Sequence, residues 1–359
     1  MAKHKLALLG CGDVAQRDYL PEFHRLAQRA EIVAVCTRSP DTMQRAMDDY
    51  GIPACYTDYA RMLAESDAAA VINLTPIALH DATNRAILAS GRHLYTEKPA
   101  ASSSTVAGEL AALAAAHGLT AVCAPSIALF PQMAFVRALL AEGAIGEIYS
   151  ARGYGHLGVP PWEGYPSDPS PFFARGAGPA MDMGVYPLHA LTALLGPVQR
   201  VTAFVAHVLD HFTVTDGPFA GTVVPVQADD NWQMILDFGG GRLASVAANN
   251  VVVDTRCPPL ELHGLAGTIA FDPIYVEQPV QLLRRGQDWQ TITPPFPHAR
   301  PGRTSGPDHI LGIEHLLDCL DGRAMPQLGL DQAAHVLRIL EAAAESSRTG
   351  RAVSIHASP

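Results

Sequence analysis

The sequence of 359 residues has few basic side chains and no cluster of them. Its 25 lysines and arginines stand against 35 aspartates and glutamates, for a formal net charge of -10. A nucleic-acid partner normally requires a basic face, so this balance argues against one. No apolar run is long enough to span a membrane, and the N-terminal residues lack a hydrophobic signal region. We therefore expect a soluble protein of the cytoplasm with no membrane partner.

The cysteines show no spacing typical of metal ligands or of disulfide bonds. The six of them stand at positions 11, 36, 55, 123, 257 and 319, and no two form a Cys-x-x-Cys pair. This scatter predicts neither a disulfide framework nor a thiolate metal site. The fifteen histidines do not combine with cysteines or carboxylates at zinc-ligand spacings, so no metal site is expected. The sequence also lacks a serine nucleophile elbow and a Walker phosphate-binding loop.

What the chain does contain is a series of short apolar runs alternating with helical segments over residues 1–124. Strands are expected at 6–9, 32–36, 68–74, 93–96 and 119–123, with helices at 14–29, 41–50, 102–117 and a further one ending near 89. Strands and helices alternating at this spacing predict a doubly wound parallel sheet with helices on both faces.

The character of the sequence changes over residues 125–359, and a chain of this length favours two domains. A helix at 130–143 precedes strand-like stretches at 148–151, 201–205, 232–236, 243–246, 260–262 and 267–270. The glycine run 239–241 is a hairpin-like turn signal. We expect an α+β domain with a large, mostly antiparallel sheet. The tail 308–350 is helical again, with a break at 322–326, and its helices could pack back on the first domain.

A glycine fingerprint follows the first strand. Gly10 permits a tight turn, Gly12 lets the backbone approach a pyrophosphate, and the small Ala15 allows the helix to pack closely on the strand. Asp13 and Val14 complete the turn, and a pyrophosphate would lie at the positive end of the following helix. Because the fingerprint follows a strand and opens a helix, it predicts a dinucleotide-binding Rossmann domain.

The choice between NAD and NADP should be made at the end of the second strand. An acidic residue there would bind the ribose 2′-hydroxyl of NAD, but this chain has Thr37, Arg38 and Ser39, with no carboxylate before Asp41. A guanidinium group with two hydroxyls suits a 2′-phosphate. NADP is therefore the preferred cofactor. NAD stays possible, because Arg38 could instead stack on the adenine.

The candidate catalytic residues are Lys98, in the tripeptide Glu97-Lys98-Pro99, and the pair Asp182 and Tyr186. The last two share one face if their segment is helical, and His189 follows three residues later. A lysine between a cofactor site and such a pair can relay a proton while a hydride leaves for the cofactor. The alternative is a solvated lysine, with an N-capping aspartate and two core side chains.

Taken in order, these motifs resemble the Gfo/Idh/MocA family, named after glucose-fructose oxidoreductase and inositol dehydrogenase, over essentially the full length. The resemblance rests on residues 10–15, Thr75-Pro76 with His80, 97–99, 143–148 and 176–186. It implies a Rossmann domain that carries a nicotinamide cofactor, and a C-terminal domain with a large open sheet. Two departures are Ile77, where an asparagine often stands, and Leu129, where an arginine often stands.

The resemblance also implies roles for single residues. Lys98 would contact both substrate and cofactor, Asp182 would orient the reacting hydroxyl, and Tyr186 would be the acid/base. Thr75, Pro76, His80 and Glu97 join the expected cofactor-binding residues. Trp162, Arg175 and His189 join the expected substrate-binding residues. The proline- and glycine-rich stretch 158–179 is either a substrate loop or an ordinary surface loop.

The implied activity is hydride transfer between the nicotinamide cofactor and a hydroxyl or carbonyl group of a sugar, sugar derivative or polyol. Two alternatives stay open. One is a redox-neutral glycosidase that keeps its cofactor bound, and the other is a non-catalytic nucleotide-sensing protein, which would be expected to lose Lys98. Self-association into a homo-dimer or homo-tetramer is expected, because the open sheet of the family is often buried in that way.

Overall fold

The computed structural model describes residues 2–155, 158–161, 165–294 and 306–355. The chain divides into two compact units. The first comprises Met1–Ser126 and Asp308–Leu337, and the second comprises Ile127–Pro307 and Arg338–Pro359. Part of the C-terminal helical tail therefore belongs to the same unit as the N-terminal residues.

The first unit is built on a parallel sheet, six-stranded over the described residues. Its strands lie in the order β3 (Ala54–Tyr56), β2 (Ala30–Cys36), β1 (His4–Leu9), β4 (Ala70–Asn73), β5 (His93–Thr96) and β6 (Ala121–Cys123). This is the strand order of the Rossmann fold, with its switch point between β1 and β4. The strands β1, β4, β5 and β6 are largely buried, as expected when helices cover both faces, whereas the edge strand β3 is only partly buried. The predicted doubly wound parallel sheet is confirmed.

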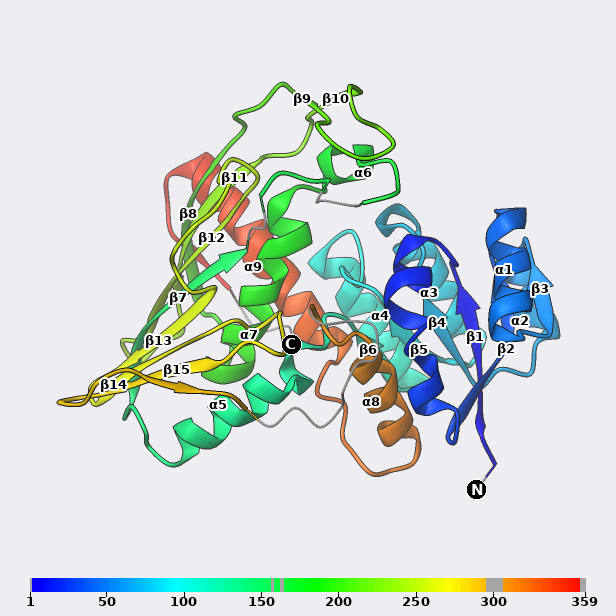
Figure 1. Cartoon of the computed structure of the whole chain (residues 1–359), viewed down its shortest axis with the longest axis horizontal. Helices are drawn as coiled ribbons and strands as arrows, with labels where there is room; N and C mark the ends of the chain where they lie inside the picture. The colour runs from blue at the N-terminus through cyan, green and yellow to red at the C-terminus, as the bar shows by residue number, and fades with distance from the viewer. Residues whose placement is uncertain (1, 156–157, 162–164, 295–305, 356–359) are drawn as a thin grey trace. The chain divides into compact units, whose positions relative to one another are not determined.

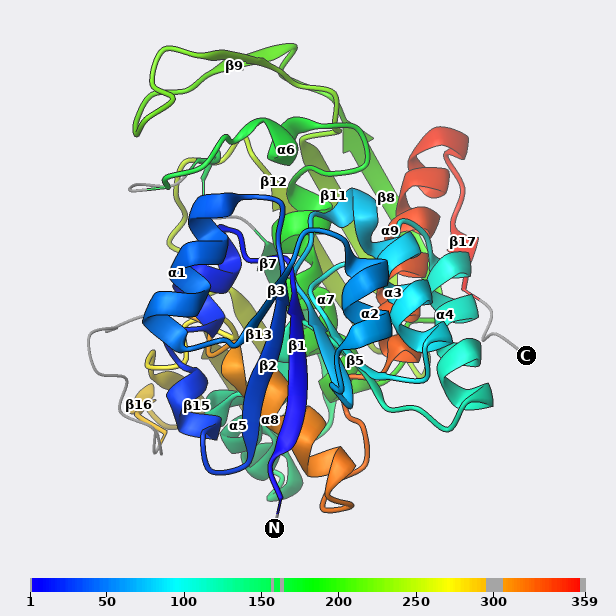
Figure 2. The same ribbon diagram turned by 90° about the vertical axis from the view of Figure 1, so that its right-hand side faces the viewer.

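Helices flank both faces of this sheet. They are α1 (Pro40–Tyr50), α2 (Tyr59–Glu65), α3 (His80–Ala89), α4 (Ser104–Ala116) and α8 (Ile310–Leu320), with the short turn η3 (Ile77–Leu79) before α3. Figure 2 shows α1 on one side of the strands and α2, α3 and α4 on the other. Ser39 and Ser103 cap α1 and α4 by accepting backbone N–H bonds, which sets where these helices begin.

The helix predicted over residues 14–29 is wrong. A π-helical turn, η1 (Ala15–Tyr19), and a 3-10 turn, η2 (Phe23–Leu26), take its place. Pro21 lies between them, and since proline lacks an amide hydrogen and clashes with the preceding turn, a regular α-helix cannot run through this position. The strand β3 and the helix α2 also lie where no element was predicted.

The second unit contains a mixed sheet, nine-stranded within the part that the structure describes. Its order is β16 (Gln290–Ile292), β15 (Val280–Arg284), β14 (Gly267–Phe271), β13 (Leu260–Gly264), β7 (Ile148–Gly155), β12 (Leu243–Asn249), β11 (Asn231–Asp237), β8 (Arg200–Ala206) and β17 (Val353–Ser354). Among these strands the β7–β12 pair is parallel and the other pairs are antiparallel. The prediction of a large, mostly antiparallel sheet is confirmed.

Helices cover one face of this sheet, and α7 lies directly over it (Figure 1). The elements of this unit outside the sheet are η4 (Ser126–Leu129, at its boundary), α5 (Pro131–Ala141), α6 (Ser170–Phe173), η5 (Ala180–Gly184), α7 (Val185–Leu195), the C-terminal part of α9 (Leu330–Thr349), and the ribbon of β9 (His211–Thr213) with β10 (Val223–Pro225). None of the described helices has the length and apolar character needed to cross a lipid bilayer.

Candidate cofactor site and catalytic residues

The glycine turn after β1 is the best-defined part of the predicted cofactor site. Gly10 has a φ of 89°, and a Cβ atom there would lie 2.6 Å from the carbonyl oxygen of Leu74. Only glycine fits such a close approach between the loops that follow β1 and β4. At Gly12 a Cβ atom would meet nothing within 4 Å, so the backbone there is open to a ligand. The turn therefore fits a dinucleotide pyrophosphate.

The neighbouring residues of the fingerprint are held by local contacts. Asp13 accepts a hydrogen bond from Nη1 of Arg17 at 2.7 Å, and Val14 begins the turn η1. Cys11 is buried, and burial raises the pKa of its thiol. Such a thiol stays protonated near neutral pH and behaves as a small apolar side chain.

At the end of β2, two of the three predicted cofactor residues interact with the first turn of α1. The hydroxyl groups of Thr37 and Thr42 lie 2.9 Å apart, and Ser39 Oγ accepts the N–H of Thr42 at 3.4 Å. Arg38 stands between them with an exposed side chain. The Arg38 side chain is therefore exposed, while the hydroxyl groups of its two neighbours, Thr37 and Ser39, contact Thr42.

A buried polar network joins the loops after β4 and β5. His80 is fully buried; its Nε2 lies 2.8 Å from the carbonyl oxygen of Thr75, and its Nδ1 lies 2.6 Å from that of Pro99. Asn73 Oδ1 accepts the hydroxyl proton of Thr75 at 2.8 Å, while its amide donates to Asn84 Oδ1 at 2.7 Å. His80 therefore positions the Thr75-Pro76 and Glu97-Lys98-Pro99 turns relative to each other.

The Glu97 carboxylate is the centre of a second buried network. It accepts the Tyr19 O–H at 2.5 Å and the backbone N–H of Lys98 at 2.9 Å. The hydroxyl of Tyr95 lies 2.8 Å from that of Tyr19. Burial, reinforced by the Glu97 charge, raises the pKa of Tyr19 well above its usual value, so Tyr19 remains a donor. Lys98 is half-buried next to this network.

His309 reaches the same network from the C-terminal tail. Its Nδ1 lies 3.8 Å from Glu97 Oε1, and its Nε2 lies 3.9 Å from Asp18 Oδ2. The next residue back, Asp308, accepts a hydrogen bond from Arg25 at 2.8 Å. The tail is thereby joined to the residues after the glycine turn. Sequence reasoning missed Tyr19, Tyr95 and His309. Tyr95 stands two residues before Glu97 and could have been noticed there, whereas His309 adjoins none of the sequence motifs.

In the second unit, Asp182, Tyr186 and His189 lie on one continuous helical segment, formed by η5 and α7. Tyr186 and His189 are buried, and Asp182 is half-buried. The segment rests directly on the sheet: a Cβ atom on Gly155 of β7 would lie 2.5 Å from the Cα atom of Gly184. Close backbone contact of this kind sets the height of Asp182 and Tyr186 above the strands.

The other predicted substrate residues are placed differently. Arg175 is exposed, in the segment between α6 and η5. Trp162 lies outside the described residues. Across the described residues, no three His, Cys, Asp or Glu side chains gather in a way that could hold a metal ion.

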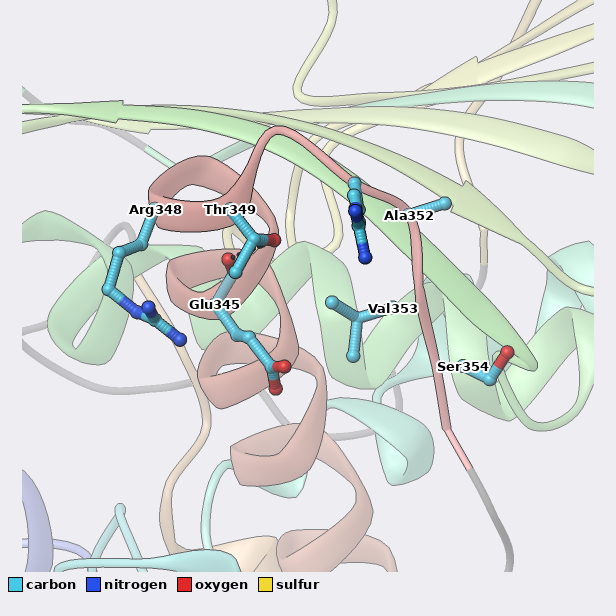
Figure 3. Close-up of a pocket in the computed structure, with 7 residues that line it drawn as sticks. Glu345, Arg348, Thr349, Ala352, Val353 and Ser354 are labelled. Carbon is cyan, nitrogen blue, oxygen red and sulfur yellow. Dashed lines mark hydrogen bonds between the residues drawn. The ribbon is translucent and has the colours of Figure 1, made fainter.

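A groove of about 560 Å³ lies elsewhere in the second unit, where α9 ends and β17 begins (Figure 3). It is lined by Glu345, Arg348, Thr349, Arg351, Ala352, Val353 and Ser354. The groove includes none of the predicted site residues, so it does not belong to the candidate site.

Comparison with known families agrees with this arrangement. Residues 4–124 match an oxidoreductase family with an NAD-binding Rossmann fold, and residues 133–270 match the GFO/IDH/MocA C-terminal domain. The two matches follow each other in the order that the motifs predict. The chain belongs to the Gfo/Idh/MocA family.

Several curated relatives in this family have names that refer to sugar chemistry. A dTDP-3,4-didehydro-2,6-dideoxy-alpha-D-glucose 3-reductase from Streptomyces violaceoruber is 30% identical over 61% of this chain and 62% of the reductase. The chain thus matches about three fifths of that relative's length. A D-xylose 1-dehydrogenase (NADP(+)) 2 from Haloferax volcanii is 22% identical over 97% of this chain and 98% of the dehydrogenase.

A solved structure within the same fold covers nearly the whole chain. Levoglucosan dehydrogenase, in complex with NADH and levoglucosan, superimposes with a TM-score of 0.82 at 20% identity. The match covers 98% of this chain and 99% of that protein. At this identity the likeness concerns the fold alone.

Proposed function

We propose that this protein is a nicotinamide-dependent dehydrogenase or reductase acting on a hydroxyl or carbonyl group of a sugar, sugar derivative or polyol. The observation that carries the proposal is the position of Lys98 at the end of β5, in a turn tied to the Thr75 loop by the buried His80. Family membership and the sugar-related names of the relatives support the same substrate class.

The bound nicotinamide would supply the hydride acceptor or donor. The backbone of Gly10 and Gly12 would hold the pyrophosphate of the dinucleotide, because the glycine turn is open at Gly12, where a ligand would approach. In the direction of oxidation, the phenolate form of Tyr186, which the positive charge of Lys98 would favour, accepts the proton of the reacting hydroxyl, and Asp182 orients that hydroxyl. The positive charge of Lys98 stabilises the negative charge that develops on the reacting oxygen.

The proposal is tested with a panel of sugars and polyols, NADP and NAD, and two variants. Lys98→Ala and Tyr186→Phe should each lower kcat by about a hundredfold to ten-thousandfold, the range of a lost acid/base group, while the cofactor Kd changes little. The matched controls are Lys3→Ala and Tyr149→Phe, since both of these side chains are exposed. Both controls should keep the native rate.

Other outcomes of this experiment would replace the proposal. Unchanged turnover in either site variant would rule out the catalytic scheme. A chromogenic glycoside is added to the panel, and its cleavage with no net change in cofactor would identify a redox-neutral glycosidase. Cofactor binding without turnover of any sugar, polyol or glycoside would favour a nucleotide-sensing protein.

We also propose that NADP is preferred over NAD. The support is Arg38, an exposed guanidinium group at the end of β2 where a carboxylate would mark an NAD site. Arg38→Ala should raise the Kd for NADP about tenfold or more, the loss expected for one charge-assisted phosphate contact, and change the Kd for NAD little. Arg61→Ala, at an exposed arginine on α2, is the control. Tighter binding of NAD than of NADP by the native protein would contradict this preference.

A homo-oligomer, dimer or tetramer, completes the proposal. Its support is the outer face of the nine-stranded sheet, where Phe204, Ile235 and Leu243 are 79%, 49% and 47% exposed. Clustered apolar side chains of this size on one face indicate an interaction surface.

A further inference from the structure

Residues 207–229, here called the hairpin, leave the large sheet after β8 and return to it at β11, and they carry a small hydrophobic core of their own. Its four buried side chains are Phe173, Val214, Val224 and Val226. Phe173 comes from α6, and its ring stacks on Phe212 of β9 with centroids 5.4 Å apart. Figure 1 shows α6 beside β9 and β10. The hairpin thus closes its core around a side chain of another segment.

That segment, residues 173–182, leads directly to Asp182 and is here called the approach segment. The backbone N–H groups of Gln227 and Ala228 both donate to the carbonyl oxygen of Phe173, at 2.8 and 3.1 Å. Five residues later the segment touches the hairpin again, because a Cβ atom on Gly178 would lie 2.8 Å from the Cβ atom of Ala228. The carbonyl oxygen of Gly178 then accepts the N–H of Asp182 at 3.0 Å.

The base of the hairpin is fixed by a buried aspartate side chain. The carboxylate of Asp230, only 1% exposed, accepts the backbone N–H groups of Val208 and Leu209, each at 2.8 Å. Nδ1 of His207 lies 3.1 Å from the carbonyl oxygen of Ala228, across the same base. A buried carboxylate with two N–H donors is a strong anchor. The two ends of the hairpin are therefore held together where they meet the approach segment.

We propose that the hairpin is a specificity element, which holds the approach segment in one arrangement and so selects substrates by size and shape. Arg175 and Asp182 are the residues whose positions it sets. The core residues of the hairpin are positioning residues and do not touch the substrate. The inference rests on the proposed function, which places those two side chains at a sugar or polyol. Small displacements of such groups strongly affect selectivity.

Two adjacent valines of β10 give a matched test: Val224 is 2% exposed and Val223 is 60% exposed. Val224→Ala removes buried methyl groups from the hairpin core and should speed amide hydrogen exchange in peptides covering 173–186 by about tenfold. Val223→Ala should leave that exchange unchanged. Faster exchange confined to residues 207–230 would overturn the inference, because the hairpin would then not hold the approach segment.

The kinetic arm uses whichever sugars the native protein turns over. Val224→Ala should change the ratio of kcat/KM between a small and a large substrate by about threefold or more, with the cofactor Kd unchanged. Faster amide exchange in residues 173–186 with an unchanged kcat/KM ratio would refute the role of the hairpin in substrate specificity. If the native protein turns over no sugar, the proposed function fails, yet the exchange arm still decides whether the hairpin holds the segment. Asp230→Asn, which weakens the anchor, should give the same results and replaces Val224→Ala should that variant not fold.

Discussion

The Glu97 carboxylate, buried beside Lys98, is held by one donor from its own motif and one from a distant part of the chain. The O–H of Tyr19 comes from the turn after the glycine fingerprint, and the N–H of Lys98 comes from the motif itself. A buried carboxylate oxygen that loses its donor is left unsatisfied, which costs more than the bond contributes on average. Tyr19 therefore bears on the position of Lys98 even though it lies in another motif.

Removal of the Tyr19 hydroxyl tests this account. Tyr19→Phe should lower the free energy of unfolding by about 1–3 kcal/mol, measured by chemical denaturation, because Glu97 stays buried with one donor fewer. Tyr149→Phe is the matched control, since its hydroxyl also donates to a glutamate, Glu147 at 2.8 Å, but at an exposed position. That control should leave the stability essentially unchanged, because water screens the exposed contact. Equal losses in both variants would contradict the account.

Among the elements, the segment of η5 and α7 depends on close backbone packing. Gly155 of β7 faces Gly184 of η5, and a Cβ atom on Gly184 would in turn lie 2.9 Å from the Cβ atom of Ala248 on β12. Small residues on both sides let the helical turn lie directly on the strands. This contact places Asp182 and Tyr186 at a defined height above the sheet.

Two glycine-to-alanine substitutions separate the steric need for glycine at this contact from the general effect of glycine on chain flexibility. Gly155→Ala should destabilise the protein by about 1–3 kcal/mol or more, since the added methyl group would meet the backbone of Gly184. Gly108 lies within α4 and faces open space, so Gly108→Ala should instead stabilise the protein by about 0.5–1 kcal/mol. Thermal unfolding of the two variants gives the comparison. A stable Gly155→Ala protein would show that η5 does not need the close approach.

The elements also differ in how far local sequence predicted them. Long apolar or periodic segments such as α4 and β8 matched the predictions. Several short elements did not, although the three-residue β6 did: β3, β9, β10 and β17 contain two or three residues each, too few for a periodic pattern. They exist because neighbouring strands or loops supply their hydrogen-bond partners, as β8 does for β17.

For the molecule as a whole, the outer face of the nine-stranded sheet is the surface on which the proposed self-association rests. Phe204 and Ile235 stand on adjacent strands, β8 and β11, and both point away from the face that α7 covers. Their burial in a second copy would remove apolar surface from water, which is the main driving force for stable association.

A charge on this face should therefore break the oligomer. Phe204→Glu is expected to convert a dimer or tetramer into smaller species, measured by light scattering at micromolar concentration, because a buried unpaired carboxylate is costly. Met325→Glu, at a residue 82% exposed in the first unit, is the control and should leave the mass unchanged. A native protein that is monomeric in this measurement would show the proposed association to be wrong.

The sequence by itself determined the fold class, the glycine turn and the order of the family motifs. These features depend on residues that are close along the chain: strand and helix periodicity, a glycine after a strand, a tripeptide after another. Only the tertiary structure decided which distant side chains share a network, as with Tyr19 and His309 around Glu97 and the hairpin around Phe173. Such contacts join residues tens to hundreds of positions apart, and they arise from the packing of a whole unit, which no local pattern encodes.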